Sequence, residues 1–171
     1  GASGGVNTAS IQISKYIGAK VIVVGSTPEK LALAQTLGAD EVILRDQKSD
    51  WSELVFNLTN KRGADVVIDN VGTTFAQSFR ALRKGGRLLT VGNTASPKFE
   101  IDNRYIFGKH LTIIGSTMGT ISDFSEVMDL ISSHQFAPSI SRSYQLADAC
   151  EAHIYLETGK NMGKVILSII E

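Results

Sequence analysis

The sequence predicts an α/β fold in which a doubly wound parallel sheet carries helices on both faces. Short runs of β-branched and aliphatic residues alternate with longer segments whose apolar residues recur at helical spacing, and this alternation is typical of parallel strands joined by crossover helices. Most of the short runs are apolar at nearly every position, as expected for strands buried on both faces. The 171 residues, 43% hydrophobic and 20% charged, suffice for one globular domain.

Five strands are predicted in the doubly wound part of the chain, and a tail of different character follows. The five strands span residues 20–25, 41–45, 65–69, 87–91 and 111–116. After Phe136, "PSISRSYQL" predicts a short strand and "GKVILSII" a final one, with a helix between them that ends at Gly159. Because this tail does not continue the strand–helix alternation, the predicted division of the chain is 1–135 and 136–171.

The predicted helices have recognisable ends. The first carries an apolar stripe from Val6 to Ile17 and ends at Gly18, a residue that commonly terminates helices. The second has Thr27 as its N-cap and Pro28 at its first helical position, both favoured at a helix start. Further helices are predicted at about 50–60, 74–83, 122–134 and 147–159.

Composition excludes several classes of partner. Seventeen Lys and Arg balance seventeen Asp and Glu, so bulk charge favours neither nucleic acid nor an anionic membrane surface. The longest apolar runs are five to six residues, far below the ~20 needed to span a bilayer. Cys150 is the only cysteine, which excludes an internal disulfide and a cysteine-cluster metal site in this stretch and predicts a cytoplasmic location. The three histidines lack partners at metal-ligand spacing, and we expect neither metal ligands nor catalytic residues in this chain.

The chain opens with a glycine-rich turn, "GASGGVNTASIQISKYIG". In the dinucleotide pattern G-x-G-x-x-G, the three glycine positions would be taken by Ala2, Gly4 and Asn7. Gly4 and Gly5 would let backbone N–H groups approach a pyrophosphate at the helix N-terminus, and the bulk of Asn7 predicts a slightly displaced helix start. Taken alone, the turn could equally be a flexible loop. The strand and second crossover that follow favour a nucleotide-binding half.

The end of the next strand indicates which dinucleotide is preferred. NAD-preferring sites commonly place an acid there, about 20 residues past the glycines, to accept the ribose 2′-hydroxyl. Here "VVGSTPEK" has no acid at the strand end. Ser26, Lys30 and Arg45 could instead bind a 2′-phosphate, so NADP(H) is favoured over NAD(H). The alternative is that Lys30 is a solvated helix residue and Ser26 a turn residue.

Five segments in order carry a family resemblance: the opening run to "GADEVI", then "GADVVIDNVG", "ALRKGGRLLTVGNT", "LTIIGSTMGT" and "GKVILSI". Together they resemble the cofactor-binding half of the medium-chain dehydrogenase/reductases, the zinc-type alcohol dehydrogenase and quinone oxidoreductase superfamily. The resemblance covers essentially the entire chain. It implies a Rossmann fold with strand order 3-2-1-4-5-6. It also implies a first strand ending just before Gly1 and an upstream GroES-like catalytic domain, neither of which is in this sequence, with the tail returning toward that domain.

The resemblance further implies roles for cofactor-binding residues. Arg45 would lie beside the adenine, and Lys164 would approach the pyrophosphate from the tail. The pyrophosphate turn would comprise Ser3, Gly4, Gly5 and Val6. The positions implied to border the ribose or the nicotinamide are Asn70, Gly72, Val91, Gly92, Asn93, Ser116 and Thr117.

The function implied by the resemblance is hydride transfer between NADP(H) and a small molecule, either an alcohol or carbonyl or a quinone or enone. Zinc would be held by the absent catalytic domain, and "GSTMGT" favours the zinc-containing branch. By analogy with the family, the strand at 111–116 would join subunits into a dimer or tetramer. Two alternatives stay open: a non-catalytic dinucleotide-binding redox sensor or scaffold, and a structural domain that binds no nucleotide.

Overall fold

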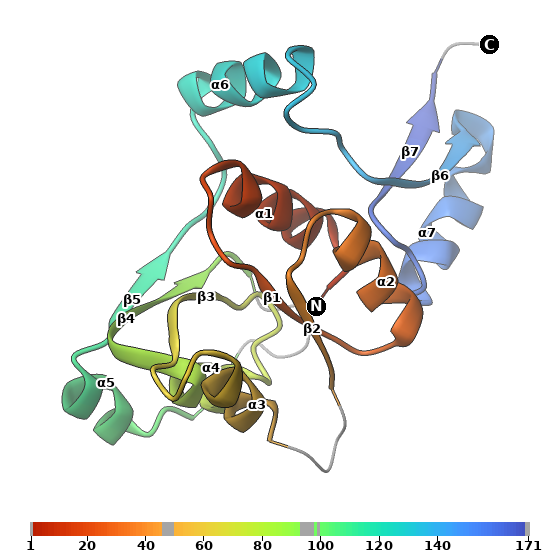
Figure 1. Ribbon diagram of the computed structural model, residues 1–171. Coiled ribbons are helices and arrows are strands. Elements are labelled where there is room, and N and C mark those ends of the chain that lie inside the picture. Colours follow the sequence, from red (N-terminus) through yellow and green to blue (C-terminus); the bar gives the residue numbers. More distant parts are fainter. Residues whose placement is uncertain (1, 46–49, 93–97, 99, 170–171) are drawn as a thin grey trace. The chain divides into compact units, whose positions relative to one another are not determined.

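The computed structural model describes residues 2–45, 50–92, 98 and 100–169 (Figure 1). Two compact units divide the chain. The continuous unit is Arg45–Gly119, and the discontinuous unit combines Ala2–Leu44 with Thr120–Glu171. Strands pair in parallel in both units, which confirms the predicted α/β class.

The discontinuous unit contains two strand pairs, each joined by a helix. Its elements are α1 (Gly5–Tyr16), β1 (Ile22–Gly25), α2 (Pro28–Thr36), β2 (Glu41–Leu44), α6 (Ile121–Ser132), β6 (Ile140–Gln145), η1 (Leu146–Asp148), α7 (Ala149–Glu157) and β7 (Lys164–Ser168). β1 pairs with β2, and β6 pairs with β7. Ile11, Val23, Leu31 and Ala34 form a buried core with Ala2. The predicted cap of α2 is confirmed, because the Thr27 side chain accepts the Lys30 N–H.

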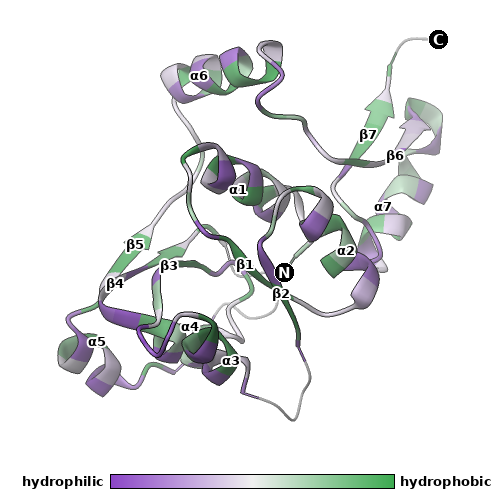
Figure 2. Ribbon diagram, in the orientation of Figure 1, coloured by the Kyte–Doolittle hydropathy of each residue, from purple (hydrophilic) through white to green (hydrophobic). Residues whose placement is uncertain are grey.

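The continuous unit is a three-stranded sheet with helices. Its elements are α3 (Trp51–Leu58), β3 (Ala64–Ile68), α4 (Phe75–Ala81), β4 (Leu82–Thr90), α5 (Asn103–Lys109) and β5 (Thr112–Gly115). The strand order is β3-β4-β5. Its core contains Phe75, Phe79, Leu82, Leu88 and Leu111. Apolar residues run along β1, β2, β5 and β7 (Figure 2).

The strand pairings agree with the predicted order. In 3-2-1-4-5-6, strands two and three pair on one side of strand one, and strands four, five and six form a group on the other. β1 and β2 make the first pair, and β3, β4 and β5 make the group.

Two elements differ from the prediction. β4 begins at Leu82, five residues before the predicted start at 87, and α5 was not predicted. The boundary at 135/136 stays a prediction.

Candidate nucleotide-binding site

The glycine-rich turn ends at the amino terminus of α1. Gly4 is the N-cap, in extended conformation (φ −68°, ψ 158°), and Gly5 opens the helix. Among the described residues, no side chain caps this end, and its first turn holds no acid. The first N–H groups of a helix have no intrahelical acceptor, and they carry the positive end of the helix dipole. This end of α1 therefore fits a pyrophosphate.

Asn7 lies inside the first turn of α1. The Thr8 N–H already donates to the Gly4 carbonyl at 3.0 Å, so Asn7 does not prevent the helix from starting within the glycine turn. A Cβ on Gly4 would lie 3.7 Å from the Asn7 side-chain nitrogen, an ordinary van der Waals distance. Asn7 therefore does not crowd the turn.

Lys164, at the start of β7, lies across the glycine turn. A Cβ on Gly5 would fall 2.8 Å from Lys164 Cε and 3.3 Å from its Nζ. Real Cβ atoms essentially never come so close, so the lysine lies where only a residue without a Cβ leaves it this position, and a side chain at Gly5 would make the flexible lysine shift. The structure thus brings together the two features that the resemblance assigned to the pyrophosphate, a bare helix N-terminus and a basic side chain. Val6, also assigned to this turn, is 45% exposed.

Ser3 attaches the same turn to residues 158–163, which we call the 158–163 loop. Its hydroxyl donates to the Asn161 carbonyl at 3.2 Å, and its carbonyl accepts the Gly163 N–H at 2.7 Å. Ser3 is 4% exposed, so its hydroxyl serves the contact with the loop. Sequence reasoning assigned Ser3 to the pyrophosphate and gave no sign of this second role.

The residues after β1 offer the second predicted subsite. Ser26 is exposed, and Lys30 lies in the first turn of α2 and is half-buried. The Lys30 Nζ donates to the Gly159 carbonyl at 2.8 Å, a partner that the sequence did not indicate. Arg45, which was grouped with these two residues, is exposed and belongs to the continuous unit.

The continuous unit has a cleft of about 440 Å³ at the carboxyl ends of β4 and β5. Its walls are Phe75, Thr90, Val91, Gly92, Gly115, Ser116 and Thr117. Open α/β sheets bind ligands at this end of their strands. Four predicted residues therefore share one cleft: Val91, Gly92, Ser116 and Thr117. Asn93, predicted with them, lies outside the described residues. The sequence did not identify Phe75 as a cleft residue, because an apolar residue in a predicted helix is expected in the core whether or not it also lines a cleft.

Asp69 organises the turn that holds Asn70 and Gly72. This carboxylate is 4% exposed. One oxygen accepts the Val71 N–H at 2.9 Å and the Gly72 N–H at 3.4 Å. The other accepts the hydroxyls of Thr74 at 2.7 Å and Ser78 at 2.6 Å. With both oxygens engaged, Asp69 fixes the turn and the start of α4 and is not a free acid or base.

Neither a metal site nor a membrane span is found among the described residues. They contain no group of three or more His, Cys, Asp or Glu side chains that could hold a metal ion. None of their helices is both long and apolar enough to cross a bilayer.

The chain has relatives among known families and proteins. The family model of zinc-binding dehydrogenases matches residues 5–133. The chain is 32% identical over 169 residues to the acryloyl-coenzyme A reductase of Sulfurisphaera tokodaii, covering 98% of this chain and 48% of that protein. It thus spans about half the length of the curated relatives it matches.

Two solved structures show the same likeness. A crystal structure of an NAD-dependent alcohol dehydrogenase matches with a TM-score of 0.93 at 33% identity, covering 99% of this chain and 49% of that one. The 2-octenoyl-CoA carboxylase reductase, in complex with NADP and 2-octenoyl-CoA, matches with a TM-score of 0.90 at 30% identity, covering 98% and 41%. Sequence and structure agree that the chain belongs to the zinc-binding dehydrogenase family and corresponds to the cofactor-binding domain of the medium-chain dehydrogenase/reductase superfamily.

Proposed function

We propose that this chain binds NADP(H) in an enzyme that transfers hydride between the cofactor and an alcohol or carbonyl, or a quinone or enone. The observation that carries the proposal is the glycine turn at the uncapped N-terminus of α1, with Lys164 lying across Gly5. When bound, the nicotinamide would donate the hydride to a carbonyl, quinone or enone, or accept it from an alcohol. The protein groups bind and orient the cofactor: the α1 N–H groups and Lys164 the pyrophosphate, and the cleft residues Val91, Gly92, Ser116 and Thr117 the nicotinamide end.

The preference for NADP(H) is supported by the residues at and just after the end of β1. Gly25 stands at the strand end, where a carboxylate would repel a 2′-phosphate. A Cβ there would lie 2.6 Å from Leu31 Cδ2, so packing against α2 also disfavours an acid at this position. Ser26 and Lys30 offer a hydroxyl and an ammonium to the phosphate. The relatives include both an NAD-dependent alcohol dehydrogenase and a reductase in complex with NADP, so these residues carry the proposal.

Titration of the full-length protein with NADPH and NADH tests this preference. We expect tighter binding of NADPH, and we expect Lys30→Ala to weaken NADPH about 10-fold or more while changing NADH little, because a hydrogen bond to a charged group contributes about 1.5–3 kcal/mol. Lys20→Ala, at an exposed lysine that pairs with Glu41, is the matched control. Tighter binding of NADH than of NADPH by the wild type would overturn the preference. If Lys30→Ala lowers the affinity for both cofactors equally, Lys30 does not bind the 2′-phosphate.

We propose that the substrate is bound mainly by the half of the full-length protein that this chain does not cover. We propose that any catalytic zinc is held there. The predicted cytoplasmic location stays a prediction. For the non-catalytic alternatives, a sensor would bind NADPH without turnover, and a nucleotide-free domain would show no thermal shift at saturating NADPH.

A further inference from the structure

The 158–163 loop contacts both predicted phosphate subsites of the discontinuous unit. Asn161 and Gly163 bind Ser3 of the glycine turn, at 3.2 and 2.7 Å. The Gly159 carbonyl accepts a hydrogen bond from the Lys30 Nζ at 2.8 Å, and this contact joins residues 129 positions apart. One short loop therefore holds both the pyrophosphate turn and the lysine that would meet the 2′-phosphate.

The contact of Lys30 with Gly159 has a clear electrostatic basis. The carbonyls at the end of a helix lack intrahelical donors and carry the negative end of its dipole. α7 has no basic residue in its last turn, and the chain leaves this helix through Gly159 at φ +64°. Lys30 places a cation from α2 beside the Gly159 carbonyl, two residues past the end of α7. An ammonium has three donors, so a bond to the Gly159 carbonyl leaves donors for an anion.

We propose that Gly159 is a positioning residue that determines cofactor specificity: its carbonyl holds the Lys30 ammonium in place for the 2′-phosphate of NADP(H). The inference rests on the proposed function and deepens it. A free lysine side chain loses much rotamer entropy when a ligand immobilises it, and fixing the side chain beforehand removes that cost from binding. NADH has no 2′-phosphate, so the contact favours NADPH alone.

The test uses Gly159→Val in the full-length protein that carries this chain. Valine disfavours the left-handed backbone that Gly159 adopts, while nothing lies within 4 Å of a Cβ there. The substitution therefore moves the carbonyl without a side-chain clash. We expect the Kd of NADPH to rise about 2- to 10-fold and that of NADH to change less than about 2-fold.

The matched control is Gly18→Val, at the glycine that follows α1. Gly18 also has positive φ, at +79°, and no atom within 4 Å of a Cβ, and its N–H bonds to the Lys15 carbonyl of its own helix. We expect the ratio of the two dissociation constants to stay at the wild-type value. A ratio that moves as much in Gly18→Val as in Gly159→Val would show a general effect of a strained helix end and overturn the proposal.

A double-mutant cycle separates action through Lys30 from a merely structural role. If Gly159 acts through Lys30, then Gly159→Val has no further effect on the ratio in a Lys30→Met background, whereas additive effects would overturn the proposal. Should Gly159→Val fail to fold, amide hydrogen exchange in Lys30→Met tests the contact between Lys30 and Gly159. Faster exchange at residues 159–163 than in wild type supports the proposal, and an unchanged rate overturns it. If wild type binds neither nucleotide, the proposed function fails. If it binds both and Gly159→Val leaves their ratio unchanged, only this inference fails.

Discussion

At the scale of single residues, Lys109 shows how one side chain completes a helix in another part of the fold. Its ammonium donates to three backbone carbonyls, those of Phe79 at 3.2 Å and of Arg80 and Leu82 at 2.8 Å. These carbonyls lie at and just after the end of α4, where a helix leaves its acceptors unpaired. Burial lowers the pKa of Lys109, and the three carbonyls engage all three donors of its ammonium.

Replacing Lys109 tests this cap. We expect Lys109→Met to lower the free energy of unfolding by about 1–3 kcal/mol, because the three carbonyls lose their donor. Urea denaturation of the variant measures the change, with Lys84→Met at an exposed position of β4 as the control. Equal stability of the two variants would contradict a capping role for Lys109.

The sequence predicted the types of residue at the candidate site better than their contacts. The segment "VVGSTPEK" showed a strand that ends without an acid and a lysine shortly after it, and these features predicted a phosphate-binding lysine. Its partner Gly159 was not visible, since a contact across 129 positions depends on how distant elements pack. Phe75 was hidden for a similar reason. A buried aromatic at a helix start has the same local pattern whether it lines a cleft or only fills a core.

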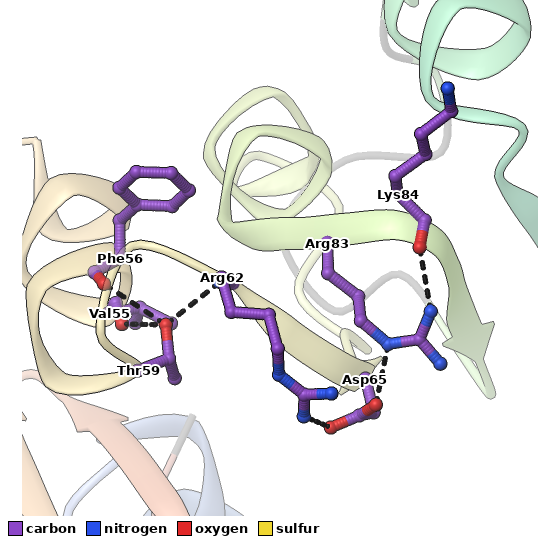
Figure 3. Close-up of polar contacts among 8 residues, drawn as sticks. Val55, Phe56, Thr59, Arg62, Asp65, Arg83 and Lys84 are labelled. Atoms are coloured by element: carbon purple, nitrogen blue, oxygen red, sulfur yellow. Dashed lines mark hydrogen bonds and ion pairs between the residues drawn. The ribbon is translucent and has the colours of Figure 1, made fainter.

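At the scale of elements, Asp65 joins the turn after α3 to two strands. Figure 3 shows Arg62, from that turn, and Arg83, from β4, pointing to the Asp65 carboxylate on β3. The hydrogen bond from Arg83 is the main cause that holds the pKa of Asp65 below its usual value, and with the charges of both arginines it outweighs the opposing effect of burial. The turn also needs Gly63, since a Cβ there would lie 2.7 Å from the Arg83 backbone nitrogen.

The lowered pKa of Asp65 predicts a loss of stability in acid. In the unfolded chain an aspartate titrates near pH 4, and in the folded chain Asp65 titrates lower. Its contribution is therefore complete above about pH 4 and is lost as the pH falls from there through the folded pKa. Asp65→Asn should flatten the pH dependence of Tm in this window, measured by calorimetry. A slope unchanged in Asp65→Asn would contradict the prediction.

The two elements that the sequence misplaced have identifiable causes. "LRKGG" resembles a polar loop, yet it forms the first half of β4, where the pairing with β3 passes from Ala64–Leu82 to Val66–Arg87 and the register shifts. Gly85, at φ +71°, makes this irregular strand possible. α5 has seven residues, too few for a helical period to stand out. Its cap is local, since the Asp102 side chain accepts the Arg104 N–H.

At the scale of the whole molecule, β5 offers a surface for assembly. It pairs with β4 alone and forms an edge of its sheet among the described strands, and all four of its residues are exposed. Exposed edge strands readily pair with another chain. We propose that β5, at the centre of the predicted 111–116 segment, joins subunits into a dimer or tetramer.

A charge on this edge tests the interface. Ile114→Lys should shift the protein toward monomer in sedimentation experiments, because lysine on an edge strand opposes pairing. Leu54→Lys places the same charge on α3 at a similar exposure, 45% against 39% for Ile114, and should leave the assembly unchanged. An Ile114→Lys protein that sediments as wild type does would exclude β5 as the interface.

The attachment of Ser3 to Asn161 and Gly163 also sets an order for folding during synthesis. The residues of the continuous unit, Arg45–Gly119, are adjacent in the chain, so this unit can form as soon as they leave the ribosome. The discontinuous unit must wait for the segment that begins at Thr120. At typical translation rates, about 50 further residues take roughly 3–10 s. During that interval the glycine turn is already made but lacks Asn161 and Gly163, so the proposed pyrophosphate turn is completed only after the 158–163 loop has been synthesised.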